Sequence, residues 1–303
     1  MSMSAGAAGL RPSPSTQPDT AAIAAELVAC GSLEMGADAP EDARRIAELL
    51  PAGTPVYVNH LPRRELAHTL AALTALSEAG LEPVPHMAAR RIGSRAEAQA
   101  FLTQAVKRAR VRRVLLIGGD LDAPSGPYAD AAALLRDGLV AGSGIEQVAL
   151  AGYPEGHPRV PTPRLEEALA EKLALAAAQG LGAHVVTQFS FAPNRIVEYC
   201  AALARTNPEL GVYVGLPGPS SPRTLLRYAQ RCGVSASLRA LQAQGMGAVR
   251  LFTHVDPTEQ LAVLARHCRT GSASNVVGVH LYSFGGVAAT ARWMNERITA
   301  RRG

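Results

Sequence analysis

The feature that most limits the fold of this chain is a repeated alternation between short apolar runs and longer amphipathic stretches. Eight apolar runs have the length and the flanking turn residues of β-strands: 27–35, 56–59, 83–88, 114–118, 147–152, 183–189, 211–216 and 276–282. The stretches between them space their apolar residues as helices do, near 40–50, 64–79, 94–109, 128–137, 163–179, 194–206, 222–232 and 257–268. Eight strand–helix units in 303 residues predict one closed (β/α)8 TIM barrel of the α/β class.

No linker divides this pattern into two domains. Residues 1–20 are rich in Ser, Pro, Gly and Ala, so we expect a short disordered leader followed by a single barrel domain at 21–303. An additional helical pattern at 236–244 interrupts the last units. An open doubly wound sheet is the main rival, but its Gly-x-Gly-x-x-Gly turn follows none of the predicted strands.

Composition argues against several classes of protein. No apolar run is long enough for a transmembrane helix, and the N-terminus lacks the basic start and apolar stretch of a secretory signal, which predicts a cytoplasmic protein. The four cysteines are widely separated and predict neither a metal site nor a disulfide framework. The net charge of +5 comes from arginines spread along the helices. Its densest cluster, 107–113, ends a helix, where cations complement the helix dipole, and does not indicate a nucleic-acid surface.

A (β/α)8 barrel carries its active site at the carboxyl ends of its strands. Most of the predicted strands end here on a residue that can hydrogen-bond or titrate. These ends are Glu34, Asn59, His86, Gly119 with Asp120, Tyr153, Gln188, Pro217 and Tyr282. Together they predict a shared pocket at the mouth of the barrel.

Five segments at strand ends resemble motifs of one enzyme family. Residues 151–158 read Ala-Gly-Tyr-Pro-Glu-Gly-His-Pro and are close to the fifth-strand motif of methylenetetrahydrofolate reductases. The segments 115–121 (LLIGGDL), 185–189 (VVTQF), 32–35 (SLEM) and 279–282 (VHLY) are similar to motifs on the fourth, sixth, first and eighth strands of that family. The similarity runs in consistent order from about residue 32 to residue 296, and its most specific part is the 151–158 motif.

The resemblance implies an FAD-dependent oxidoreductase that interconverts 5,10-methylenetetrahydrofolate and 5-methyltetrahydrofolate with NADH or NADPH. FAD would lie across the barrel mouth, take a hydride from the nicotinamide and pass it to the folate, while the protein supplies position and electrostatics. A folate is then the expected partner, and the family likeness also suggests a homo-oligomer. Neither a nucleic acid nor a membrane is expected as a partner.

The resemblance assigns the folate chemistry to residues at three strand ends. Glu34 would deliver a proton to a folate nitrogen, which a carboxyl in a partly closed barrel mouth can do when its pKa is raised. Asp120 would lie near the flavin and hydrogen-bond the pterin; the alternative for this residue is a helix N-cap. Gln188 would pair with the pterin edge through its amide, and Phe189 and Tyr282 would add substrate contacts.

The same resemblance places FAD contacts around the mouth. They are Asn59, His86, Gly119, Asp120, Tyr128, Ala129, Ala151, Tyr153 and His157. The chain departs from the family at Gly118, where an arginine is common, and at Pro222, where many members have a stacking aromatic. Two alternatives follow. One is a flavin-free folate-binding barrel, similar to a methyltransferase, that keeps Asp120 and Gln188. The other is a barrel without catalysis that serves as a partner subunit.

Overall fold

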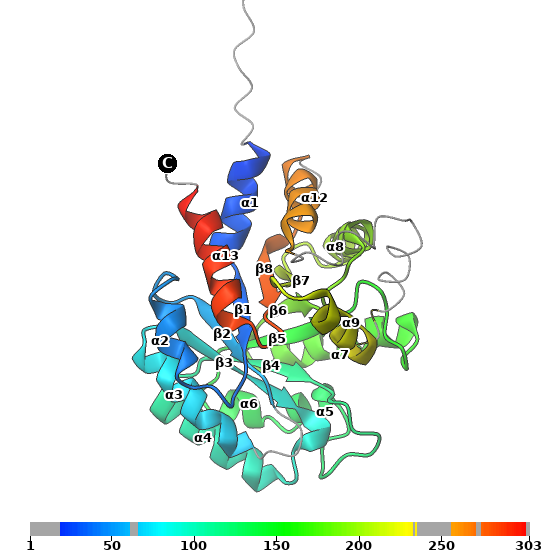
Figure 1. The fold of residues 1–303 in the computed structure, drawn as a ribbon. Helices are drawn as coiled ribbons and strands as arrows, with labels where there is room; N and C mark the ends of the chain where they lie inside the picture. Colours follow the sequence, from blue (N-terminus) through cyan, green and yellow to red (C-terminus); the bar gives the residue numbers. More distant parts are fainter. Residues whose placement is uncertain (1–18, 61–65, 233, 235–255, 271–273, 301–303) are drawn as a thin grey trace, which may run out of the picture.

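The computed structural model describes residues 19–60, 66–232, 234, 256–270 and 274–300. Its parallel strands close into one barrel in sequence order, with β8 paired to β1 (Figure 1). The strands are β1 (Ser32–Met35), β2 (Pro55–Val58), β3 (Glu82–Ala88), β4 (Arg113–Ile117), β5 (Gln147–Gly152), β6 (Gly182–Thr187), β7 (Val212–Pro217) and β8 (Val276–Tyr282). The predicted (β/α)8 TIM barrel is therefore confirmed.

Helices surround the barrel on its outer side (Figure 1). They are α1 (Thr20–Ala29), α2 (Asp42–Ala47), α3 (Leu70–Glu78), α4 (Arg95–Ala109), α5 (Ala131–Arg136), α6 (Leu139–Gly142), α7 (Thr162–Ala178), α8 (Pro193–Thr206), α9 (Pro222–Cys232), α12 (Thr258–Arg269) and α13 (Val287–Thr299). Two 3₁₀ turns, η1 (Leu66–Thr69) and η2 (Ala89–Arg91), join strands to helices. The turn η2 is important for the site because it follows β3 directly at the carboxyl end of the barrel.

The prediction was wrong in two places near the chain ends. Residues 27–29, predicted as part of the first strand, belong to α1, and β1 begins only at Ser32. The Ala-rich segment before Gly31 favours a helix. At Gly31 an added Cβ would lie 2.7 Å from the carbonyl oxygen of Val279, so the turn from α1 into β1 passes very close to β8. Helix α13 had no predicted counterpart, and the helix predicted at 236–244 lies outside the described residues.

Alternation along the strands divides the buried side chains into two layers. Leu33, Val56 and Val114 belong to the core between the strands and the helices. A second cluster fills the barrel axis: Tyr57, Val84, Leu115, Ala149 and Val186. Glu34 pairs in register with Tyr57, and His86 pairs with Leu115. Both therefore belong to the inward-facing set, as the site prediction requires.

The axis of this barrel is polar, although branched apolar residues commonly fill such interiors. Tyr57 Oη lies 3.1 Å from His184 Nε2, and Ser32 Oγ lies 2.8 Å from His280 Nδ1. Burial, together with a smaller effect of neighbouring cationic groups, lowers the pKa values of His86, His184 and His280 to about 3. The three imidazoles are therefore neutral at pH 7.

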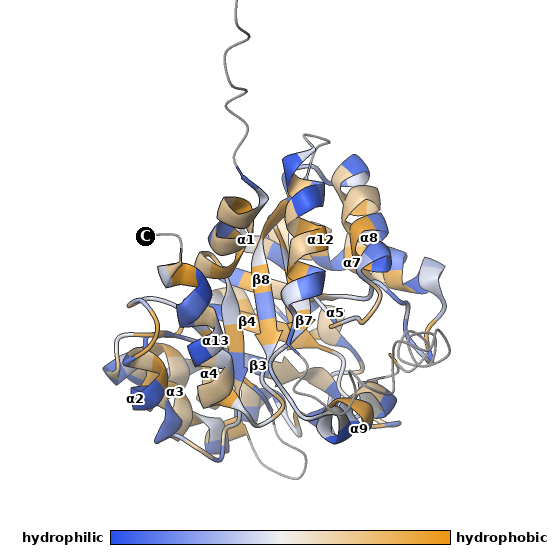
Figure 2. Ribbon diagram, turned by 45° about the horizontal axis from the view of Figure 1, so that its top comes forward, coloured by the Kyte–Doolittle hydropathy of each residue, from blue (hydrophilic) through white to orange (hydrophobic). Residues whose placement is uncertain are grey.

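Hydropathy follows the same division into layers. Figure 2 shows apolar residues along the strands and on the sides of helices that meet them, with hydrophilic residues on the outer surface. In the described part of the chain, no helix combines the length and the apolar character needed to cross a membrane.

Candidate active site at the barrel mouth

Glu34 lies next to the carboxyl end of β1, with its side chain closely surrounded by protein but still partly open to solvent. Asn59, directly after β2, donates a hydrogen bond from Nδ2 to Glu34 Oε1 over 3.2 Å. Desolvation by burial raises the pKa of Glu34 to about 7, and the hydrogen bond from Asn59 opposes this by favouring the ionised form. A large share of the molecules therefore carries a proton on Glu34 at neutral pH.

Two buried polar atoms, one directly after β2 and one on β3, have no hydrogen-bond partner among the described residues. They are Asn59 Oδ1 and His86 Nε2. Such atoms cost free energy unless a ligand or water completes them. Burial and the nearby His60 lower the pKa of His86 to about 3. A neutral imidazole donates through one nitrogen and accepts through the other, so these two atoms suit the polar edge of a ligand.

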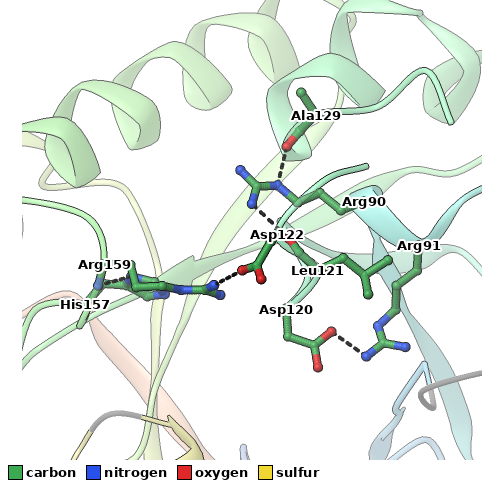
Figure 3. Close-up of polar contacts among 8 residues, drawn as sticks. All are labelled: Arg90, Arg91, Asp120, Leu121, Asp122, Ala129, His157 and Arg159. Atoms are coloured by element: carbon green, nitrogen blue, oxygen red, sulfur yellow. Dashed lines mark hydrogen bonds and ion pairs between the residues drawn. The ribbon is translucent and has the colours of Figure 1, made fainter. Parts of the chain in front are cut away.

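Asp120 stands at the carboxyl end of β4, where Gly119 turns the chain with φ of +90°. Arg91, the last residue of η2, forms an ion pair from Nη2 to Asp120 Oδ1 (Figure 3). The Arg91 side chain is only 11% exposed, whereas that of Asp120 is 53% exposed. The alternative role considered for Asp120, a helix N-cap, belongs to Asp130, which accepts a hydrogen bond from the Ala133 amide at the start of α5.

Arg90 holds the loop after β4 against η2 (Figure 3). Its Nε donates to the carbonyl of Ala129 over 2.7 Å, and its Nη1 donates to the carbonyl of Leu121 over 3.0 Å. In return, the Ser125 amide donates to the carbonyl of Arg90 over 2.8 Å. The loop packs so closely that a Cβ on Gly126 would lie 2.3 Å from the Gly93 carbonyl oxygen.

An exposed ion pair links the loop after β4 to the loop after β5. Arg159 Nη1 lies 2.7 Å from Asp122 Oδ1, with side chains that are 54% and 95% exposed. The Arg159 amide also donates to His157 Nδ1 over 3.2 Å (Figure 3). The His157 ring meets the edge of Tyr153 at a centroid distance of 5.3 Å.

Several residues assigned to FAD already make contacts within the chain. The Tyr128 side chain is buried, and its hydroxyl donates to Asp137 Oδ2 over 2.8 Å. The Ala129 carbonyl accepts from Arg90, and His157 accepts from the Arg159 amide. The structure brings Gly119, Asp120 and Ala129 together through η2 and the loop after β4, where Asp120 pairs with Arg91 and the Ala129 carbonyl accepts from Arg90.

The predicted substrate residues lie directly after β6 and at the end of β8. Gln188 Oε1 accepts from the Phe189 amide over 3.1 Å, and the Tyr282 hydroxyl donates to the Thr187 carbonyl over 2.9 Å. Phe189 is almost completely buried and packs against Tyr282 and Phe284. Substrate contact by these residues stays a prediction.

Ala151 and Tyr153 line a cavity of about 910 Å³. Its other walls come from α7 and α8, including Leu165, Leu169 and Tyr199. The 151–158 motif is therefore divided, because its first residues border this cavity whereas His157 lies in the loop that Arg159 ties to Asp122.

Sequence reasoning missed three groups that shape the mouth. Arg90 and Arg91 lie in η2, one residue after β3, and two adjacent arginines near a strand end could have indicated them. Ser283 donates from Oγ to the backbone carbonyl of Glu34 over 2.6 Å and so ties the end of β8 to β1. The interior His184 and His280 precede Gln188 and Tyr282 by an even number of residues, so the two-residue period of strands could have placed them on the axis.

The described residues contain no group of three or more His, Cys, Asp or Glu side chains that could hold a metal ion.

No family model matches the chain. Among solved structures, the chain is similar to a crystal structure of dihydropteroate synthetase with product 1, with a TM-score of 0.45 and 13% identity over 90% of this chain and 92% of that one. It is also similar to dihydropteroate synthase from Thermus thermophilus, with a TM-score of 0.44 and 16% identity over 90% of this chain and 92% of that one. At this identity the likeness concerns the fold alone.

These findings correct the family assignment. The predictions of a methylenetetrahydrofolate reductase and of a flavoprotein oxidoreductase are wrong, because no family model supports them and the similar solved structures are dihydropteroate synthases. The resemblance rested on short letter matches at strand ends. Several residues in those matches are used in contacts within this chain, such as His157 with the Arg159 amide. The FAD and nicotinamide expected through that resemblance stay untested predictions.

Proposed function

We propose that this chain is an enzyme that binds a reduced folate at the carboxyl end of its barrel and acts on it by acid catalysis without a flavin. The reaction class that fits is transfer of a one-carbon group from a folate nitrogen to a nucleophilic acceptor. This is the flavin-free alternative that the sequence already left open.

The observation that carries the proposal is the Glu34 carboxyl. Its pKa of about 7 places it near the optimum for a general acid at neutral pH. Protonation of an amine nitrogen makes that nitrogen a better leaving group for the carbon it holds. After the transfer of its proton, Glu34 is a carboxylate, and the hydrogen bond from Asn59 stabilises that charge.

Two further features support a pterin as the ligand. A pterin presents hydrogen-bond donors and acceptors along one edge of a flat ring. Asn59 Oδ1, directly after β2, and His86 Nε2, on β3, have unmet hydrogen-bonding capacity. Asp120, at the end of β4, adds a carboxylate that can accept from the N–H groups of such an edge.

The residues assigned to FAD fit that cofactor poorly. Tyr128 gives its hydroxyl to Asp137, and the Ala129 carbonyl is taken by Arg90. Binding of FAD at these groups would first require those hydrogen bonds to break. The proposed chemistry therefore uses the Glu34 carboxyl and not a flavin.

The test is equilibrium binding of tetrahydrofolate and methyltetrahydrofolate to the purified protein, together with its absorbance spectrum with and without added FAD. The proposal expects folate binding and no flavin absorption that stays with the protein through gel filtration. A tightly held flavin would contradict the flavin-free reading, and a lack of affinity for either folate would contradict the substrate class.

Catalysis is tested separately with Glu34→Gln. Glutamine can still accept the hydrogen bond from Asn59 but cannot donate an acid proton to substrate. The assay is the conversion of methyltetrahydrofolate to tetrahydrofolate in the presence of a thiol as methyl acceptor, and mass spectrometry measures the products. We expect the rate of this conversion to fall by about 100-fold or more, while folate affinity stays within about threefold. If turnover is unchanged, Glu34 is not the acid.

A further inference from the structure

Two ion pairs with similar chemistry but different burial hold the loop after β4. Arg91 pairs with Asp120, and Arg159 pairs with Asp122 two residues later (Figure 3). The Arg91 side chain is 11% exposed and belongs to the short turn η2 that follows β3. The Arg159 side chain is 54% exposed and lies in the loop after β5.

We propose that Arg91 is a positioning residue, which fixes the Asp120 carboxylate at the mouth so that it can accept the N–H groups of a pterin edge. The inference rests on the proposed folate-binding function and deepens it, since it names the residue that orients one of the ligand contacts. Arg91 touches Asp120 and acts through it.

The difference in burial decides which of the two pairs can hold a carboxylate in place. An exposed ion pair contributes little, because water screens its charges and both side chains keep much of their freedom. A mostly buried guanidinium has few alternatives to its partner, since an uncompensated buried charge is strongly unfavourable. The Arg91 head group is thus committed to Asp120, whereas Arg159 and Asp122 can both turn to solvent.

Backbone hydrogen bonds also hold η2, which contains Arg91, against the loop after β4. The Arg90 amide donates to the carbonyl of Gly118 over 3.0 Å, and the Ser125 amide donates to the Arg90 carbonyl over 2.8 Å. Gly119 between them has the positive φ that allows the chain to turn into Asp120. The backbone near Asp120 is therefore held by η2, and Arg91 holds the Asp120 side chain.

The experiment compares Arg91→Met with Arg159→Met by calorimetric titration of tetrahydrofolate. Methionine keeps much of the aliphatic volume and removes the charge in both variants. We expect Arg91→Met to weaken tetrahydrofolate binding by about tenfold or more, as loss of a charge-assisted hydrogen bond does, and Arg159→Met to stay within about twofold of the wild type. Arg91→Lys should regain part of the affinity, because a single nitrogen makes the contact.

Two measurements separate a positioning role of Arg91 from a general effect of the substitution on the fold. The first is p-aminobenzoylglutamate, the part of folate without the pterin, whose binding Arg91→Met should leave unchanged. The second is a double-mutant cycle with Asp120→Asn. If Arg91 acts through Asp120, Arg91→Met should cost less than about twofold once Asp120→Asn is present.

The possible outcomes separate the positioning role of Arg91 from the proposed folate-binding function. If the wild type does not bind tetrahydrofolate, the proposed function fails and the positioning role fails with it. If the wild type binds but Arg91→Met binds equally well, only the positioning role is overturned. Equal losses in Arg91→Met and Arg159→Met, or effects of Arg91→Met and Asp120→Asn that simply multiply, also overturn it.

Discussion

At the scale of single residues, burial makes Glu34 both suitable as an acid and costly for stability. The pKa of this carboxyl is raised from 4.5 to about 7 in the folded protein. The folded state therefore binds the proton more tightly than the unfolded state does. The stability that comes from this proton is fully present below pH 4.5 and is lost as the pH rises through 7.

Replacing Glu34 by glutamine should therefore stabilise the protein at alkaline pH. Glutamine has a similar shape and no charge to bury, so at pH 8 the Glu34→Gln variant should gain up to about 3 kcal/mol in the free energy of unfolding. That figure is an upper bound, because the side chain is partly open to solvent at the barrel mouth. Urea unfolding at pH 8 and pH 5.5 measures the gain, which should fall to less than half at the lower pH.

The matched control is Glu78→Gln at the exposed end of α3. This substitution also removes one negative charge but not a buried one, and it should change the stability little at either pH. A Glu34→Gln variant that is no more stable at pH 8 than the wild type would show that the folded protein does not disfavour the Glu34 charge.

At the scale of secondary-structure elements, the end of β7 passes unusually close to β6. A Cβ on Gly215 would lie 2.1 Å from the carbonyl oxygen of Thr187 and 2.9 Å from the carbonyl carbon of Gln188. The Gly215 amide meanwhile donates to Thr187 Oγ1 over 2.8 Å. The absence of a side chain at this position is what allows Thr187 and Gln188 to sit where they do at the mouth.

Gly215→Ala should therefore force the two strands apart. We expect a loss of about 3 kcal/mol in the free energy of unfolding, at the upper end for overpacked cores, measured by urea denaturation. Gly142→Ala is the matched control, since its Cβ would meet no atom within 4 Å and it ends the helix α6. That change should be neutral or stabilise by about 0.5 kcal/mol. Equal behaviour of the two variants would contradict the close approach.

The same scale shows why sequence patterns predicted the strands better than the site. Strand positions follow from local apolar runs, so the barrel was predictable, whereas α1 and β1 share one apolar run with only Cys30 and Gly31 between them. The Arg91–Asp120 pair joins two loops across 29 positions in sequence, and no local pattern reports such a contact. Glu34 was identified through a motif, but its raised pKa depends on the burial that only the closed barrel supplies.

At the scale of the whole molecule, the buried titratable groups act against one another as the pH falls. His86, His184 and His280 have pKa values lowered from 6.5 to about 3. Below pH 6.5 the unfolded chain binds protons at these histidines that the folded barrel does not accept, so their contribution to stability is lost between pH 6.5 and about 3. Between pH 7 and 4.5 the proton on Glu34 works in the opposite direction.

The balance predicts how steeply acid destabilises the barrel. Between pH 6.5 and 4.5, unfolding lets the three histidines take up about three protons, whereas Glu34 releases about one. The net uptake on unfolding is therefore about two protons. Each proton corresponds to about 1.4 kcal/mol per pH unit, so the free energy of unfolding should fall by about 3 kcal/mol per pH unit. Over this range the loss approaches the whole stability of an ordinary domain, so we expect the barrel to unfold near the lower limit.

Glu34→Gln should make this acid transition steeper, although it stabilises the protein at pH 8. Without the opposing proton the uptake rises to about three, and the slope of unfolding free energy against pH should rise by about half. His184→Gln should reduce the uptake by about one proton instead. Urea unfolding at several pH values measures the three slopes. Equal slopes for the wild type and both variants would contradict the shifted pKa values of Glu34 and His184 in the folded protein.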